Sequence, residues 1–153
     1  MDLVTNSFIR QAFIFLVIVS LSVAGMRALL GGDATTKNDA SLEARHEALA
    51  RDTAGGRSAE ETFKLFVDAL ERRDALGASR YFILDAQDEM HEKLSSGFSA
   101  GVMPELVALL RGPKKLSKLS DQRYQYAFAV EESHFTIDIV LNPLSATWKL
   151  EAF

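Results

Sequence analysis

The chain has 153 residues, of which 48% are hydrophobic and 25% are charged, and its formal net charge is −4. This length allows one domain with accessory segments, and the composition is ordinary for a globular protein. The acidic balance argues against a nucleic-acid-binding protein, which normally carries a basic excess or stripe. Because the chain has no cysteine, a disulfide framework, a thiolate metal site and a cysteine nucleophile are all excluded.

The most apolar part of the sequence lies close to the first residue. Residues 11–26, QAFIFLVIVSLSVAGM, carry no charge, and as a helix they would extend roughly 24 Å, somewhat less than a hydrocarbon core of about 30 Å. Apolar neighbours lengthen the segment to residues 8–30, and Arg10 and Arg27 lie where their side chains reach the two membrane interfaces. The sequence therefore predicts a short tail (1–7) followed by a transmembrane signal anchor (8–30).

Two alternatives to the anchor stay open. Ser22-Val23-Ala24 has the small residues of a signal-peptide cleavage site, and the segment would also serve as a buried core helix. The positive-inside rule favours a cytoplasmic N-terminus only slightly, since Arg27 opposes Arg10. We expect a single-pass protein of the cell membrane whose C-terminal domain lies outside the cytoplasm.

Residues 31–57 are poor in large apolar side chains and predict a polar linker. Within it, SLEARHEALAR has a Ser N-cap candidate at Ser41 and good helix formers, so a short exposed helix is expected. His46 lies in this helix among charged residues, where a solvated side chain is the simpler interpretation than a ligand.

Helices are predicted next, beginning with a capping box formed by Ser58 and Glu61, in which the glutamate reaches back to the Ser58 amide. An apolar stripe at i, i+3, i+4 and i+7 follows, made of Phe63, Phe66, Val67 and Leu70. Further helices are expected to begin at Asp74, at Asp85 and near Pro104.

The period then changes to two, which predicts three strands at about 124–130, 135–141 and 147–151. A turn at Glu132-Ser133 would place Phe128 opposite Ile137, and every large apolar side chain would share one face. A second turn would set Leu141 opposite Trp148. Residues 114–120 are a further candidate for an edge strand.

Helices followed by an antiparallel meander form an α+β plan, with three to four helices packed on a curved sheet of three to four strands. The runs AEETFKLFVDALERRDALGASRYF and TWKLEAF resemble the nuclear-transport-factor-2-like superfamily, in particular small bacterial membrane-anchored members. The resemblance covers residues 58–153, although Arg73 stands where such sequences often have glycine. It implies a cone-shaped domain (58–153) with a pocket between helices and sheet. The candidates for lining this pocket are Phe63, Tyr81, Tyr124, Tyr126 and Trp148. For Tyr124 and Tyr126, whose hydroxyls need partners on the core face, packing in the core is the simpler interpretation.

No catalytic, cofactor-binding or metal-binding residues are predicted, and no cofactor is expected. The strand register directs Asp138 away from the apolar face, towards a solvated outer face. The three histidines, His46, His91 and His134, are far apart and lack the spacing of metal ligands. A basic cluster, suited to acidic lipid headgroups, to a partner or simply to a solvated sheet edge, is formed by Arg111, Lys114, Lys115, Lys118 and Arg123.

These features favour a membrane-anchored, non-enzymatic module that binds a protein partner or a small ligand. The partner would bind in the pocket or on the sheet, where a second copy of the chain is one candidate, and neither nucleic acid nor metal is expected. One alternative is a structural subunit of a cell-envelope or secretion assembly, because the type IV secretion scaffold has the same order of anchor, linker and domain. Another is an isomerase or dehydratase-like enzyme, since the superfamily's fold hosts both.

Overall fold

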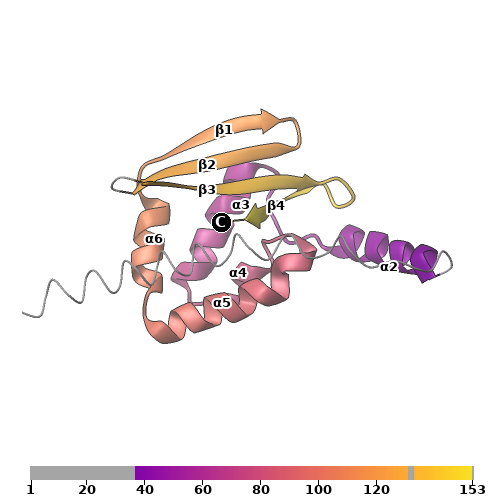
Figure 1. Cartoon of the computed structure of the whole chain (residues 1–153), viewed down its shortest axis with the longest axis horizontal. Helices are drawn as coiled ribbons and strands as arrows, with labels where there is room; N and C mark the ends of the chain where they lie inside the picture. The colour runs from indigo at the N-terminus through magenta and orange to yellow at the C-terminus, as the bar shows by residue number, and fades with distance from the viewer. Residues whose placement is uncertain (1–36, 131–132, 153) are drawn as a thin grey trace, which may run out of the picture.

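A computed structural model describes residues 37–130 and 133–152. The described chain is α+β, with five α-helices, one short 3₁₀ helix and a four-stranded antiparallel sheet (Figure 1). In chain order the elements are α2 (Lys37–Arg51), α3 (Ala59–Glu71), α4 (Ala75–Ser79), η2 (Leu84–Ala86), α5 (Gln87–Ala100), α6 (Met103–Arg111), β1 (Lys114–Ser120), β2 (Arg123–Val130), β3 (Ser133–Asn142) and β4 (Thr147–Ala152).

The start of α3 confirms half of the predicted capping box. Ser58 Oγ accepts a hydrogen bond from the Glu61 amide at 3.1 Å. The Glu61 carboxylate does not return to the Ser58 amide, as predicted, but accepts from the amide of Arg57 at 2.6 Å. The predicted apolar stripe is confirmed as the buried face of the helix, since Phe63, Phe66, Val67 and Leu70 are all buried.

The turn between α3 and α4 confirms the predicted cap at Asp74, whose Oδ1 accepts from the Gly77 amide at 2.7 Å. The preceding residue, Arg73, has φ of 59°, in the left-handed region that disfavours side chains other than glycine. The backbone therefore gives a physical reason why a glycine would suit this position, although the chain uses arginine here.

The predicted start of the next helix at Asp85 is wrong. Residues 84–86 form η2, and α5 begins at Gln87 without a side-chain cap. The Asp85 carboxylate is instead paired with Arg45 of α2, forty residues earlier in the chain. The helix predicted near Pro104 is confirmed as α6, with proline in its first turn and Gly112 after its last residue.

The four strands follow one another in the order β1-β2-β3-β4, and β1 confirms the predicted edge strand at residues 114–120. The register predicted between β2 and β3 is wrong by two residues, because Phe128 lies opposite Phe135 and not Ile137. A shift of two residues keeps the same side chains on the same face, so hydrophobic alternation could not detect it. The Phe128 and Phe135 rings stack with centroids 4.6 Å apart.

The register between β3 and β4 is confirmed, with Leu141 opposite Trp148 and Ile139 opposite Leu150. The edge of β4 that does not face β3 is partly paired with the segment that follows α4. The Ile83 amide donates to Leu150 O, and the Leu150 amide donates to Tyr81 O, both at 2.8 Å.

The core lies where α3 packs against one face of the sheet, with α4 and α5 on the opposite side of α3 from the sheet (Figure 1). Phe63 meets Tyr126 of β2 with ring centroids 4.5 Å apart. Phe66 and Phe82, on the helical side, meet edge to face at 5.4 Å. Rings of β2 and of the segment that follows α4 therefore both pack against α3.

The end of the predicted linker is bonded to the domain. Gly56 O accepts from the Trp148 amide at 3.0 Å, and the Thr62 hydroxyl donates to Trp148 O at 3.0 Å. A Cβ on Gly55, whose φ is 138°, would lie 2.4 Å from Trp148 O, so only glycine lets the chain pass this close to β4. Contacts thus extend across the predicted boundary between residues 57 and 58.

Within residues 37–130 and 133–152, no helix is long and apolar enough to cross a membrane. The predicted tail (1–7) and anchor (8–30) lie outside the described residues, and both stay predictions.

Candidate functional site

A hollow of about 470 Å³ lies between the C-terminal half of α2, the Ile83–Asp85 segment and the turn from β3 to β4. Most of its exposed wall is apolar. The apolar lining consists of Leu49, Ile83, Leu84, Val140, Leu141, Pro143 and Leu144. Three segments that are distant in sequence therefore build one concave surface, and we call it the α2 hollow.

Asn142 fixes α2 to the end of β3. Its side-chain amide donates to Leu49 O at 2.8 Å, and its Oδ1 accepts from the Leu144 amide at 3.1 Å. Asn142 is buried, and both polar ends of its side chain are satisfied. One residue thus shapes both the helix wall and the turn wall of the α2 hollow.

A buried ion pair forms the polar part of the lining. Lys149 is only 2% exposed, and its Nζ donates to Asp52 Oδ1 at 2.5 Å and to Arg80 O at 2.9 Å. Asp52 Oδ2 accepts from the Gln87 side chain at 2.9 Å. Burial lowers the pKa of the Lys149 ammonium, and the adjacent Asp52 carboxylate opposes that shift.

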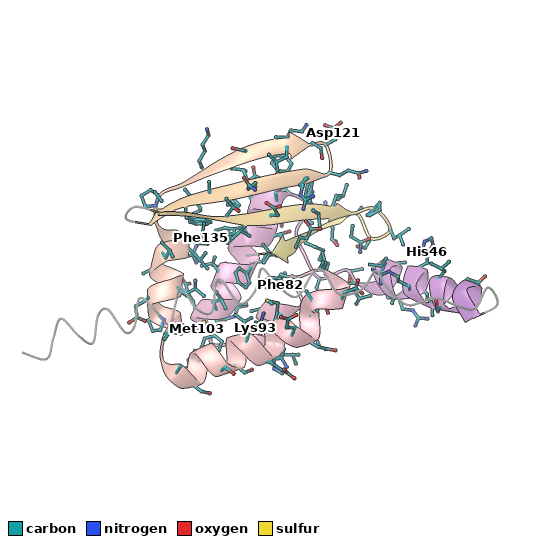
Figure 2. The ribbon with its side chains drawn as sticks, viewed as in Figure 1. His46, Phe82, Lys93, Met103, Asp121 and Phe135 are labelled. Atoms are coloured by element: carbon teal, nitrogen blue, oxygen red, sulfur yellow. The ribbon has the colours of Figure 1, made fainter. Side chains whose placement is uncertain are left out.

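The rim carries a second ion pair. Arg45 of α2 donates to both carboxylate oxygens of Asp85, at 3.1 and 2.5 Å. Both side chains are more than half exposed, so the pair contributes at most about 1 kcal/mol to stability. His46 also lines the α2 hollow and is exposed, and Figure 2 shows it on α2, remote from Phe82 and Phe135.

Four charged side chains of the α2 hollow form two ion pairs, in which the carboxylates of Asp52 and Asp85 each face a cation. Among the described residues, no serine, threonine or tyrosine hydroxyl lines the α2 hollow, and its lysine amine, that of Lys149, is held by Asp52. In the part of the chain that the structure describes, no group of three or more His, Asp or Glu side chains is placed to hold a metal ion.

The five residues predicted to line a pocket belong to the core instead of the α2 hollow. Phe63, Tyr126 and Trp148 are buried, while Tyr81 and Tyr124 are partly buried and pack against the core. Tyr124 meets Trp148 edge to face, with ring centroids 5.1 Å apart. Burial, with a smaller effect of Glu60, raises the pKa of Tyr126 to about 12. None of the five lines the α2 hollow.

Asp138 lies on the outer face of the sheet, as predicted from the alternation. It accepts from the Gln125 side chain at 2.8 Å and pairs with Arg123 at 3.2 Å. Arg123 is also bonded to Glu151 of β4. This outer face is therefore a network of paired polar side chains across β2, β3 and β4.

The other two histidines do not join a site in the described structure. His91 is half-buried on α5 and does not line the α2 hollow. His134 belongs to β3, but its side chain lies outside the described residues.

Most members of the predicted basic cluster have anionic or carbonyl partners. Arg111 pairs with Asp68 and Glu71, and Lys118 pairs with Asp121. Lys114 donates to Leu110 O at 2.9 Å, at the C-terminal end of α6. The positive charge predicted for this edge is thus largely neutralised locally.

The pairing of Lys149 with Asp52 was not anticipated from the sequence. Lys149 stands between two core residues of β4, so alternation places it on the outer face, where a lysine is normally solvated. It is buried where its ammonium meets Asp52, the residue after α2, and the carbonyl oxygen of Arg80. No local pattern in the sequence signals this contact: Leu42 and Leu49 share one side of α2, but Leu42 is 55% exposed.

Comparison with known proteins adds no relative: no family model matches the chain, and neither a curated protein nor a solved structure is similar to it.

Proposed function

We propose that this protein is a non-enzymatic binding module, tethered to a membrane by residues 8–30, that takes its ligand in the α2 hollow. The observation that carries the proposal is the α2 hollow itself, which is concave, mostly apolar and built by three segments that a buried ion pair and a buried amide hold together. A largely preformed apolar hollow with few polar groups is the usual form of a ligand site.

We further propose that residues 58–153 belong to the nuclear-transport-factor-2-like superfamily. Two features support this assignment: helices precede an antiparallel meander, and α3 packs on the same sheet face as Trp148. Because that fold serves many activities, the superfamily does not define the function, and the α2 hollow is the feature that supports ligand binding.

Ligand binding is tested by filling the α2 hollow. We expect the full chain, purified from membranes, to release a small molecule on solvent extraction, detected by mass spectrometry in near-stoichiometric amount. The Val140→Trp variant should release much less, because its indole occupies the α2 hollow. The matched control is Ala127→Trp, on the same outer face of the sheet but outside the α2 hollow. Equal release from wild type and Val140→Trp would contradict the proposal.

The tether is tested separately by flotation of the full chain with lipid vesicles. Arginine in place of Leu16 and Val19 should release the protein from the floating fraction. Each central arginine makes the free energy of membrane insertion less favourable by roughly 3 kcal/mol. Flotation that survives both substitutions would exclude residues 8–30 as the membrane anchor.

A further inference from the structure

We propose that the ligand of the α2 hollow is an uncharged small molecule with an aliphatic body. This inference rests on the proposed function, because it names the ligand class of the same hollow. It follows from three properties of the lining: its volume, its apolar walls and the pairing of its charges.

The volume and walls suit a small aliphatic molecule. About 470 Å³ falls within the roughly 300–1,000 Å³ typical of small-molecule sites. The walls are aliphatic, with Leu49 on one side, Ile83 and Leu84 on another and Leu144 at the turn. No phenylalanine, tyrosine or tryptophan lines the α2 hollow, so it lacks the aromatic face that recognition of an organic cation commonly uses.

The charges of the lining cancel in pairs. Lys149 is bonded to Asp52 and Arg45 to Asp85, which leaves no formal excess of either sign apart from the exposed His46. An anionic ligand would have to compete with a carboxylate for its cation, and a cationic ligand would have to compete with a cation for its carboxylate. Burying a charge without such compensation is unfavourable, so an uncharged ligand is preferred.

The rim favours a small molecule over a polypeptide segment. The Arg45–Asp85 pair joins α2 to η2 on one side of the α2 hollow, and Asn142 joins α2 to the β3–β4 turn on another. A polypeptide entering between these elements would have to break at least one of these connections. A small molecule fills the space between the walls without disturbing them.

The test compares three probes of equal chain length, 1-hexanol, hexanoate and hexylammonium, on the full chain in lipid nanodiscs at neutral pH. Binding is followed by the methyl NMR signals of Ile83 and Val140, with the fully buried Ile137 as internal control. At matched free aqueous concentration, 1-hexanol should bind at least tenfold more tightly than either ion.

The two proposals fail in different ways. If an ion binds as tightly as 1-hexanol, the ligand class is wrong while the α2 hollow stays a binding site. If no probe shifts Ile83 or Val140, the proposed function is overturned as well.

Two variants test the pairing argument. Asp52→Asn leaves the Lys149 ammonium without its carboxylate. In this variant the affinity for hexanoate should rise at least tenfold relative to the affinity for 1-hexanol. Arg45→Gln leaves the exposed Asp85 unpaired, so the affinity for hexylammonium should rise about two- to fivefold. Because the lost ion pair is exposed, this variant should fold as the wild type does. Unchanged probe preferences in Arg45→Gln, or in a folded Asp52→Asn, would overturn the argument.

Discussion

Different kinds of contact hold two regions of the sheet. One region is the face that packs against α3, and the other is the end of β3 and β4 that contacts the end of α2. Against α3 the contacts are aromatic, as where Phe63 meets Tyr126 and Phe128. At the α2 end, the connections are polar, made by Asn142 and by the Lys149–Asp52 pair. We call this second region the α2 joint.

The difference matters because the two kinds of contact fail differently. Apolar packing loses stability in proportion to the volume removed, whichever partner is truncated. A buried ion pair is sensitive to losing one partner but tolerant of losing both, because the penalty comes from the charge left behind. The core should therefore govern global stability, and the α2 joint should govern where α2 sits and whether the α2 hollow exists.

The largest effect is expected from a cavity in the core. Phe63→Ala should lower the free energy of unfolding by about 3–5 kcal/mol, because Phe63 is 4% exposed and contacts two rings of β2. Urea unfolding followed by the fluorescence of Trp148, the single tryptophan, measures it. Leu76→Ala is the matched control, since Leu76 is 51% exposed and should change stability by less than about 0.5 kcal/mol. Equal effects of the two would contradict the assignment of Phe63 to the core.

The next largest effect is expected at the α2 joint. Lys149→Met should cost about 3 kcal/mol of stability, because it leaves the Asp52 carboxylate largely buried without its cation. The double variant Lys149→Met, Asp52→Leu should recover most of this loss, which a double-mutant cycle in urea would measure. If the double variant loses the sum of the stabilities lost by the two single variants, Lys149 and Asp52 are not coupled. The α2 joint would then not differ from the core in the way proposed.

The third effect is a dependence of the free energy of unfolding on pH, caused by Tyr126 in the core. Its pKa in the folded protein, about 12, lies above the ordinary value near 10, so its stabilising effect is complete below pH 10 and is lost as pH rises to 12. The loss across this window should be about 2–3 kcal/mol, at 1.36 kcal/mol per pKa unit. Unfolding of wild type and Tyr126→Phe at pH 10 and pH 12 gives the difference, and identical pH slopes would contradict a buried hydroxyl.

The smallest effect is expected from the exposed ion pair at the rim. Arg45→Gln should lower stability by less than about 1 kcal/mol, because both side chains are more than half exposed. The difference should shrink further in 1 M NaCl, where screening is strong. A loss as large as that of Lys149→Met would show that the two ion pairs of the α2 hollow are not distinguished by burial.

Local patterns predicted much of the fold. The stripe on α3 and the alternation of the strands correctly identified which side chains face the core, because periodicity is a direct consequence of backbone geometry. The same alternation could not set the β2–β3 register, since pairing Phe128 with Phe135 or with Ile137 keeps both on one face. The helix start predicted at Asp85 was wrong, and the carboxylate expected to cap it is paired with Arg45, forty residues earlier in the chain.

The candidate site was much less accessible to prediction. The five aromatic residues proposed for a pocket fill the core, whereas the α2 hollow is lined by residues of the predicted linker and of the β3–β4 turn. Its Lys149–Asp52 pair joins positions 97 residues apart, which no local pattern can bring together.

The sequence by itself determined which faces of α3 and of the strands are buried, where α3 and α4 are capped, and that an uncharged apolar segment precedes a polar stretch. Only the tertiary structure decided the strand register, the contact of α2 with the end of β3 and the burial of Lys149. Hydrophobic periodicity is a local property of the chain, but the position of one element on another depends on contacts between residues far apart in sequence.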